Sequence, residues 1–314
     1  MTELLRLTDL KKSYDGKKLA LDGINLSVQS GEFIVVIGPS GAGKSTLIRT
    51  INQLVRPTSG TVYFDGCELT SLKGRALRKK RGDIGMIFQH YNLIGRTNVI
   101  KNVLHGRLSR MPFYKSLLGL YPEIERSQAL NLLKTVGLED QIYQRASDLS
   151  GGQMQRVGIC RALMQEPKLI LADEPIASLD PKSADIVMDQ LKTITTRRQI
   201  TCIVNLHQVD YAKQYATRIL GVKEGKIVFD GPPEALSTKI TAAIYAGKEE
   251  QMSLTGTENK DNKAAIKEIT PTAPNEAPIP NATELHAPLV NSTAVVASET
   301  ALSTATKETG GLAL

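Results

Sequence analysis

Residues 38–46 read Gly38-Pro39-Ser40-Gly41-Ala42-Gly43-Lys44-Ser45-Thr46 and fit the pattern G-x-x-x-x-G-K-[ST]. An apolar, β-branched run, Phe33–Ile37, precedes this stretch, as is typical of a buried parallel strand. The segment that follows it, Thr46–Leu54, carries apolar residues at helical spacing. A strand, a glycine-rich turn and a helix in this order form a phosphate cradle, because the turn and the helix N-terminus present backbone N–H groups. We therefore expect residues 38–46 to bind a nucleotide.

Two side chains of this loop have a specific chemistry. Lys44 supplies a positive charge for the phosphates, and the Ser45 hydroxyl can reach a Mg²⁺ ion. Nucleotide hydrolysis also needs a carboxylate for the metal and a group that activates water. Asp173 and Glu174 stand at the end of the apolar run that begins at Leu169. We expect Asp173 to hold Mg²⁺ through its water shell and Glu174 to polarise the attacking water as a general base.

The composition is that of a globular protein. The 314 residues suffice for one large or two ordinary domains, and 41% are hydrophobic and 23% charged. No apolar run approaches the roughly 18 residues that a membrane span needs, and Met1–Arg6 shows no signal-peptide pattern. The three cysteines fit neither a disulfide framework nor metal-ligand spacing: Cys67, Cys160 and Cys202. We expect a reducing, cytoplasmic compartment in which the cysteines pack as small apolar residues.

The net charge of +7 raises the question of a nucleic-acid partner. The densest basic cluster, Lys73–Arg81, has no aromatic residues between its bases that could stack on nucleotides. An anionic lipid surface, a partner subunit and plain solvation all account for such a basic face. We expect no nucleic-acid partner.

Alternating strand and helix patterns predict an α/β fold with a mostly parallel sheet. We expect core strands at Phe33–Ile37, Ile84–Gln89, Leu169–Asp173 and Thr201–Leu206, and a closing hairpin of Arg218–Val222 and Lys226–Phe229. Leu4–Leu10, expected as an edge strand, and Ile24–Val28 predict a small N-terminal antiparallel sheet. Helical periodicity from about residue 99 to 136, interrupted by prolines, predicts an inserted helical subdomain over about residues 95–160.

The composition changes after about Lys248. Residues 251–314 contain no Phe, Tyr, Trp or Arg, and their four lysines stand against seven carboxylates. Such a segment cannot bury enough apolar surface to offset the entropy lost on ordering. We expect an ATP-binding domain over residues 1–248 and a disordered tail, rich in Ala, Thr, Pro and Glu, over residues 249–314.

A second anion-binding pattern occurs at Leu149–Gln153. Ser150, followed by two glycines at a helix start, combines free N–H groups, a hydroxyl and the helix dipole. It cannot serve the phosphates that residues 38–46 already enclose. With this motif the chain resembles, over about residues 3–248, the ATP-binding subunits of ABC transporters, which implies a P-loop NTPase (RecA-like) core. In that family two subunits face each other head to tail, and the Ser-Gly-Gly of one closes on the γ-phosphate held by the other.

The resemblance implies roles for further residues. Tyr14 stands where the family stacks an aromatic ring on adenine, and Gln89 matches the residue that senses Mg²⁺ and water and contacts the membrane subunit. His207 matches the histidine that steadies the γ-phosphate, and Ser178–Asp180 matches the loop that crosses the dimer interface. Ile176 replaces the threonine commonest in the family, at a position that faces no phosphate.

The implied site falls into three groups of residues. The catalytic group is Lys44, Gln89, Glu174 and His207. The metal-binding group is Ser45, Gln89 and Asp173. The nucleotide-binding group is Tyr14, residues 38–46, Gln89, Ser150, Gly151, Gly152, Gln153 and Asp180.

The resemblance also implies ligands and partners. The ligands are ATP and Mg²⁺; the partners are a second copy of the chain, membrane permease subunits and, through the complex, a solute-binding protein. Such a chain lies at the cytoplasmic face of the plasma membrane. Asn102–Leu108, the insertion around Met111–Tyr121 and Asp173–Asp180 look like the phosphonate-importer ATPases, so we expect uptake of a phosphonate, a phosphite or a phosphate ester.

Other functions stay open as alternatives. They are an importer of another small polar solute, such as an amino acid or methionine, and an exporter or lipoprotein-release ATPase. A different class is a soluble ABC protein that acts on ribosomes or DNA. It is disfavoured because the chain has one P-loop, no internal repeat and no extended heptads.

Overall fold

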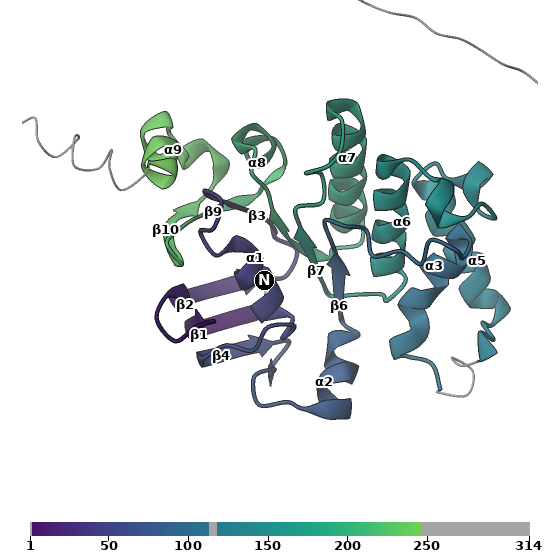
Figure 1. Ribbon diagram of the computed structural model, residues 1–314, viewed down its shortest axis with the longest axis horizontal. Helices are drawn as coiled ribbons and strands as arrows, with labels where there is room; N and C mark the ends of the chain where they lie inside the picture. The colour runs from purple at the N-terminus through teal and green to yellow at the C-terminus, as the bar shows by residue number, and fades with distance from the viewer. Residues whose placement is uncertain (1, 113–117, 247–314) are drawn as a thin grey trace, which may run out of the picture. The chain divides into compact units, whose positions relative to one another are not determined.

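The computed structural model describes residues 2–112 and 118–246. Its larger sheet has six strands in the order β10-β9-β3-β8-β7-β6 (Figure 1). These strands are β3 (Phe33–Ile37), β6 (Ile84–Ile87), β7 (Leu169–Asp173), β8 (Thr201–Asn205), β9 (Arg218–Lys223) and β10 (Lys226–Gly231). Strands β3 and β6 to β9 run parallel, and β10 pairs antiparallel with β9. The predicted α/β fold with a mostly parallel sheet and a closing hairpin is confirmed.

The central strands are buried on both faces. Every residue of β3, β7 and β8 is buried, which accounts for their uninterrupted apolar sequences. Along β3, Phe33, Val35 and Ile37 face one hydrophobic cluster. The alternate residues Ile34 and Val36 face a second cluster. The sheet therefore lies between two cores.

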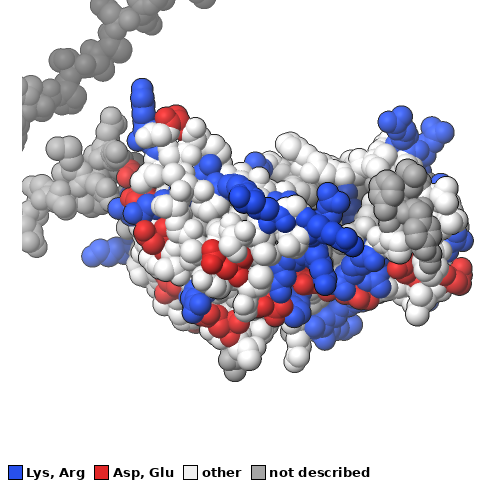
Figure 2. All heavy atoms as spheres, turned by 90° about the horizontal axis from the view of Figure 1, so that it is seen from below, with Lys and Arg blue, Asp and Glu red and all other residues white. Residues whose placement is uncertain are grey.

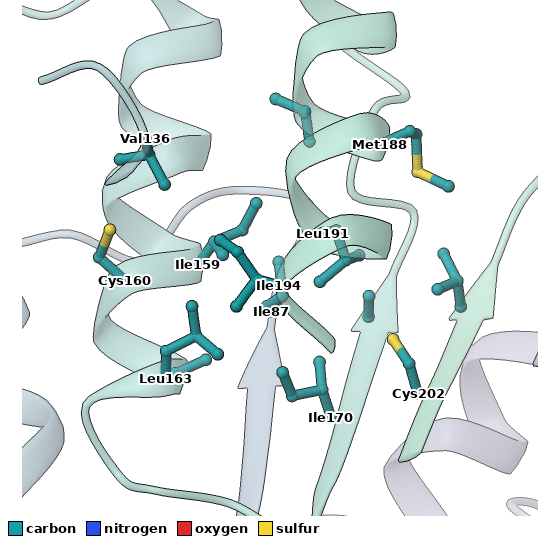
Figure 3. Packing of buried hydrophobic residues seen from close by; sticks show 14 of the residues in the cluster. Ile87, Val136, Ile159, Cys160, Leu163, Ile170, Met188, Leu191, Ile194 and Cys202 are labelled. Carbon is teal, nitrogen blue, oxygen red and sulfur yellow. The ribbon is translucent and has the colours of Figure 1, made fainter. Parts of the chain in front are cut away.

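Helices cover the first face of the sheet. They include α6 (Gly151–Leu163), α7 (Pro181–Arg197), α8 (Val209–Tyr215) and α9 (Thr238–Tyr245). Figure 3 shows side chains of α6 and α7, among them Leu163 and Leu191, directed toward Ile170 and Cys202 on the strands. Cys160 and Cys202 are fully buried here, as expected, whereas Cys67 is half-buried.

A small sheet and α1 (Lys44–Ile51) cover the second face. The small sheet has the order β2-β1-β4-β5, with β1 (Glu3–Ser13), β2 (Leu19–Gln29), β4 (Ser59–Phe64) and β5 (Cys67–Glu68). The predicted antiparallel sheet is confirmed, but the prediction of β1 as an edge strand is wrong, because β1 pairs with both β2 and β4. Alternation shows which face of a strand is buried and not which strands lie beside it.

The segment between β6 and β7 is helical. It contains α3 (Val99–Leu104), α5 (Glu123–Thr135) and α6, with short 3₁₀ turns η1 (His105–Ser109), η2 (Glu139–Gln141) and η3 (Ala146–Asp148). Another turn, η4 (Pro233–Ala235), precedes α9. Val103 and Leu133 of this segment pack into the first core. The predicted boundary near residue 248 and the predicted disorder of residues 249–314 lie outside the described residues.

Helix α2 (Gly74–Arg81) carries the basic cluster. Figure 2 shows lysines and arginines gathered on the face seen from below, the side on which Figure 1 draws α2. Lys80 pairs with Asp65 at 2.7 Å. Four other bases are exposed and form no ion pair with the described residues: Lys73, Arg75, Arg78 and Lys79. Among residues 2–112 and 118–246, no helix is both long and apolar enough to span a membrane.

Candidate functional site

Four adjacent parallel strands end at the same edge of the large sheet. Residues 38–46 follow β3, and Leu206 and His207 follow β8. Asp173 ends β7 and is followed by Glu174, while Gln89 lies two residues beyond β6. Because the carboxyl ends of neighbouring parallel strands meet at one edge, segments far apart in the sequence come together here.

The loop of residues 38–46 depends on its glycines. Gly38 has φ 148° and Gly43 has φ 105°. A side chain at Gly38 would collide with the Val222 carbonyl, and one at Gly43 with the Ala20 carbonyl. Gly43 is also the N-cap of α1, and no side chain among the described residues caps that helix. The backbone N–H groups of the first turn of α1 are therefore presented toward the loop, as an anion site requires.

Lys44 is almost completely buried, at 4% exposed. Its Nζ donates hydrogen bonds to the carbonyl oxygens of Gly38, at 2.7 Å, and Pro39, at 3.0 Å. Burial lowers the pKa of the Lys44 ammonium, and the nearby carboxylates of Glu174 and Asp173 oppose this shift. The loop thus holds a cation beside two carboxylates.

A cavity of about 210 Å³ opens at this loop. It is lined by Ala20, residues 40–46, Glu174 and His207. The structure therefore brings the predicted general base and the predicted histidine to the predicted phosphate-binding loop.

Glu174 and His207 contact each other directly. Glu174 Oε1 lies 2.7 Å from His207 Nε2. Glu174 has a left-handed backbone, with φ 53°, and its N–H donates to the Asn205 carbonyl at 3.2 Å. A non-glycine residue adopts this conformation only where its surroundings enforce it, and such strain is common at functional sites.

Asp173 is 2% exposed and is held through both carboxylate oxygens. Oδ2 accepts from Arg49 Nε at 3.1 Å and Nη2 at 3.0 Å. Oδ1 accepts from Asn205 Nδ2 at 3.0 Å. The same Asn205 nitrogen lies 3.2 Å from Ser45 Oγ. One amide therefore links the two side chains predicted to contact the metal.

The aromatic ring of Tyr14 is exposed to solvent next to the phosphate-binding loop. Its side chain is 65% exposed, and its hydroxyl lies 3.3 Å from Thr46 Oγ1. Lys12 Nζ lies 5.1 Å from the ring centroid on one face. The hydroxyl contact brings the ring to the end of the phosphate loop, where a base could stack on it.

Gln89 is half-buried and begins a strained turn. Tyr91 and Asn92 both have left-handed backbones, with φ 54° and 50°. Arg161 of α6 donates to the carbonyl oxygens of both residues. Arg161 thus connects the turn after Gln89 to α6, the helix whose N-cap is Ser150.

Ser150 and Gln153 form a capping box at the start of α6. Gln153 N donates to Ser150 Oγ at 3.3 Å, and Ser150 N donates to Gln153 Oε1 at 2.8 Å. Asp180 caps α7 by accepting from Ser183 N at 3.0 Å. Hydrogen bonding from the side chain and then from the backbone N–H of Ser183 lowers the pKa of the Asp180 carboxyl group. The side chains of Ser150 and Asp180 thus cap helices within a single chain.

The structure does not bring Ser150, Gly151, Gly152, Gln153 or Asp180 to the cavity. Helices α6 and α7 pack in the first core, whereas α1 packs in the second. The two predicted anion sites therefore start from opposite faces of the large sheet (Figure 1).

Three residues of the site were missed by the sequence patterns. Arg49 and Asn205 hold Asp173, and Tyr245 of α9 donates its hydroxyl to the His207 carbonyl at 3.1 Å. The polar Asn205 within an otherwise apolar run, Cys202–Leu206, is a signal that could have been used. Arg49, four residues after Ser45 on a helix, is another. Tyr245 gives no such signal.

Comparison with known proteins gives the family. The ABC transporter family model matches residues 21–177. The phosphonates import ATP-binding protein PhnC 2 of Oceanobacillus iheyensis is 51% identical over 249 residues, which cover 79% of this chain and 98% of that protein. PhnC of Treponema denticola is 50% identical over 237 residues, which cover 76% of this chain and 93% of that protein.

Solved structures agree with the fold. A dimeric ATP-binding cassette in a post-hydrolysis state with ADP and Pi is 34% identical, with a TM-score of 0.66, and the match covers 74% of this chain and all of that one. An ADP-bound cassette of an ABC transporter is 29% identical, with a TM-score of 0.67, and the match covers 81% of this chain and 99% of that one. The chain belongs to the ABC transporter family, as one of its ATP-binding subunits.

Proposed function

We propose that this chain is the ATP-hydrolysing subunit of an importer that takes up phosphonates, phosphite or phosphate esters. The observation that carries the proposal is the match to two relatives named as phosphonates import ATP-binding proteins, 51% and 50% identical over 98% and 93% of their lengths. The cavity itself supports ATP binding and has no bearing on the cargo, since it is lined by Ala20, residues 40–46, Glu174 and His207.

In this proposal residues 38–46 enclose the phosphates of ATP. The loop and the N-terminus of α1 supply N–H donors. Lys44 Nζ, now at the carbonyls of Gly38 and Pro39, would turn to the phosphate oxygens. Tyr14 would stack on the adenine, and its ring has the exposure that stacking needs.

The residues around Ser45 fit a Mg²⁺ ion. A hydroxyl and a carboxylate, linked through Asn205 Nδ2, are the oxygen donors that Mg²⁺ prefers. No group of three His, Cys, Asp or Glu suited to a metal occurs in the part of the chain that the structure describes. Gln89, water and the phosphates would supply the remaining ligands in this proposal. When bound, Mg²⁺ would neutralise charge on the phosphates.

We propose that Glu174 activates the attacking water. Its carboxylate lines the cavity, and the 2.7 Å contact with His207 Nε2 supports a fixed orientation. His207 lines the same cavity, which supports its role in steadying the γ-phosphate. Together with Gln89 and Lys44, these residues form the proposed catalytic set.

We further propose that two copies pair head to tail, so that Ser150, Gly151, Gly152 and Gln153 of each copy close over the nucleotide of the other, with Asp180 at the interface. The separation of Ser150 from the cavity within one chain supports this arrangement. So does the dimeric state of similar solved cassettes. Loss of the γ-phosphate would remove charge-assisted hydrogen bonds between the copies and let them part.

We propose that a hollow of about 690 Å³ beside α3 and α5 contacts a membrane permease. Its lining mixes charged, polar, aromatic and aliphatic side chains, among them Lys101, His105, Leu108, Tyr121 and Glu123. Burial, together with the charges of Arg161 and Lys101, lowers the pKa of His105. Such a contact would hold the chain at the cytoplasmic face of the plasma membrane and relay the motion of the turn after Gln89.

Uptake in cells tests the proposal. The chain is produced together with a candidate permease and a candidate solute-binding protein, in cells that lack another phosphonate importer. We expect growth on a phosphonate as the phosphorus source, and no growth with Lys44→Ala. Uptake of an amino acid instead of phosphonate would favour the other-solute alternative. Co-purification with nucleic acid in high salt would favour the soluble class.

A further inference from the structure

Asn205 is a fully buried polar residue at the end of β8. Its Nδ2 lies 3.2 Å from Ser45 Oγ and 3.0 Å from Asp173 Oδ1. An amide nitrogen carries two protons, so it can donate to both oxygens at once. Its Oδ1 is buried and has no hydrogen-bond partner among the described residues.

The sheet fixes where this amide lies. In the parallel registers Asn205 stands beside Asp173 of β7 and Val36 of β3. Its carbonyl oxygen accepts from Glu174 N at 3.2 Å. The backbone of Asn205 is therefore held on both sides, and its side chain reaches between the strand that carries Asp173 and the loop that carries Ser45.

A buried, unpaired carbonyl destabilises a fold, and an aliphatic residue would avoid this cost at a strand end that is otherwise apolar. The rest of β8 consists of buried residues in close packing. The presence of an amide is therefore best explained by the two oxygens that its nitrogen holds.

We propose that Asn205 is a positioning residue that orients Ser45 and Asp173 for the divalent metal ion bound with the nucleotide. This inference rests on the proposed function, in which the side chains of Ser45 and Asp173 bind the metal ion. One N–H of Asn205 occupies a lone pair of Ser45 Oγ and leaves the other lone pair for the metal. The second N–H fixes Asp173 Oδ1, while Arg49 holds Oδ2.

Removal of the amide leaves these side chains free to turn. In Asn205→Ala, Arg49 is the remaining side-chain partner of Asp173 among the contacts described above, so the carboxylate can rotate toward it. The Ser45 hydroxyl loses its donor as well. Loss of a hydrogen bond that orients a metal ligand typically weakens metal affinity by roughly 10- to 100-fold. We expect at least about a tenfold loss for this variant.

Metal binding is measured without hydrolysis. The purified full chain is held in excess over a non-hydrolysable ATP analogue, Mn²⁺ is titrated in, and unbound Mn²⁺ is read from its electron paramagnetic resonance signal. Affinity for the analogue in EDTA is measured separately. We expect Asn205→Ala to weaken Mn²⁺ binding and to leave the affinity in EDTA unchanged, because the hydrogen bonds that the amide nitrogen donates among the described residues go to Ser45 and Asp173, the two proposed metal-binding side chains.

Two further variants separate positioning from packing. Asn205→Leu fills the volume of the amide without its donor and should lose Mn²⁺ affinity like Asn205→Ala. Val204→Ala, the neighbour on the same strand, removes core volume and should keep it. Thermal unfolding without ligands confirms that each variant is folded.

Each remaining outcome counts against the inference. Unchanged Mn²⁺ affinity in both Asn205 variants overturns it, and so does a loss in Asn205→Ala that Asn205→Leu does not share. An equal loss in Val204→Ala would assign the effect to general weakening of β8. A wild-type chain that binds no nucleotide would instead overturn the proposed function, a result distinguishable from the others because it precedes the metal titration.

Discussion

Glu174 combines a strained backbone conformation with a proposed role as the general base. It follows the buried Asp173, turns into a left-handed conformation with φ 53°, and so places its carboxylate against His207 at the cavity. A strand that simply continued would carry the side chain along the sheet. The strained backbone is therefore what brings the proposed base to the phosphate loop.

The variant Glu174→Gln tests this base. Glutamine keeps the shape of the side chain but cannot accept the proton from water. We expect it to bind ATP and to hydrolyse it about 10²- to 10⁴-fold more slowly, the usual contribution of a general base. The bound ATP should also trap the paired state, seen as a doubled mass in gel filtration with ATP. Turnover at the wild-type rate would remove Glu174 from this role.

The cysteines give a prediction about reactivity. Burial raises the pKa of the Cys160 thiol to about 12, and burial also raises that of Cys202. Only the thiolate reacts, so at pH 8 both groups are almost entirely in the unreactive form. We expect a thiol reagent to label Cys67 in the folded protein and all three cysteines after denaturation. Cys67→Ser is the control, and fast labelling of Cys160 or Cys202 in the native state would contradict the packing.

At the level of elements, the bounds of the buried strands could be predicted from the sequence, but the pairing between neighbouring strands could not. Leu169–Asp173 was predicted to the residue, because an apolar run bounded by polar residues marks a strand covered on both faces. The inner position of β1 was missed, since it depends on pairing with β4, more than 45 residues away in sequence. The same limit hid Asn205 and Arg49, because both contact Asp173 from distant parts of the sequence.

The start of α6 has a structural role as a helix cap and a proposed role in phosphate binding, and one substitution can separate the two. Ser150 caps the helix in this structure, and in the proposed dimer it contacts a phosphate. Asp is as good an N-cap as Ser and favours the positive end of the helix dipole. We therefore expect Ser150→Asp to change the unfolding free energy by less than about 1 kcal/mol. Its negative charge should repel the γ-phosphate and abolish ATP-driven pairing and hydrolysis.

Calorimetry and ATPase assays check this variant together. Ser150→Thr, which keeps both the cap and the hydroxyl, is the matched control. Normal hydrolysis by Ser150→Asp would mean that no phosphate lies at this helix start. A large loss of stability would mean that the cap depends on more than the hydroxyl oxygen.

At the scale of the whole molecule, sequence motifs predicted parts of the proposed site but not the contacts between them. The order of motifs predicted that residues 38–46, Asp173, Glu174 and His207 act together, and the sheet order β3-β8-β7 brings them to one edge. The 2.7 Å contact of Glu174 with His207 could not be predicted, because it depends on the strained turn after β7. That Ser150 lies away from the cavity follows from the opposite faces that α6 and α1 cover.

Removal of residues 251–314 should leave ATP hydrolysis unchanged. The residues that line the cavity all lie between Ala20 and His207. The curated relatives match over 249 and 237 residues of this chain, and these matches cover 98% and 93% of their own lengths. ATPase rates of the shortened and full chains, compared at equal concentration, check this. A changed rate would assign the acidic segment a regulatory role.

The central claim is that each catalytic site is shared between two copies of the chain. The most direct test is the ATPase rate per chain over a wide range of protein concentrations, for the wild type and for Ser150→Arg. We predict that the wild-type rate rises with concentration as pairs form, and that Ser150→Arg binds ATP yet stays inactive throughout. A full rate in the isolated monomer, or wild-type turnover by Ser150→Arg, would contradict the shared site.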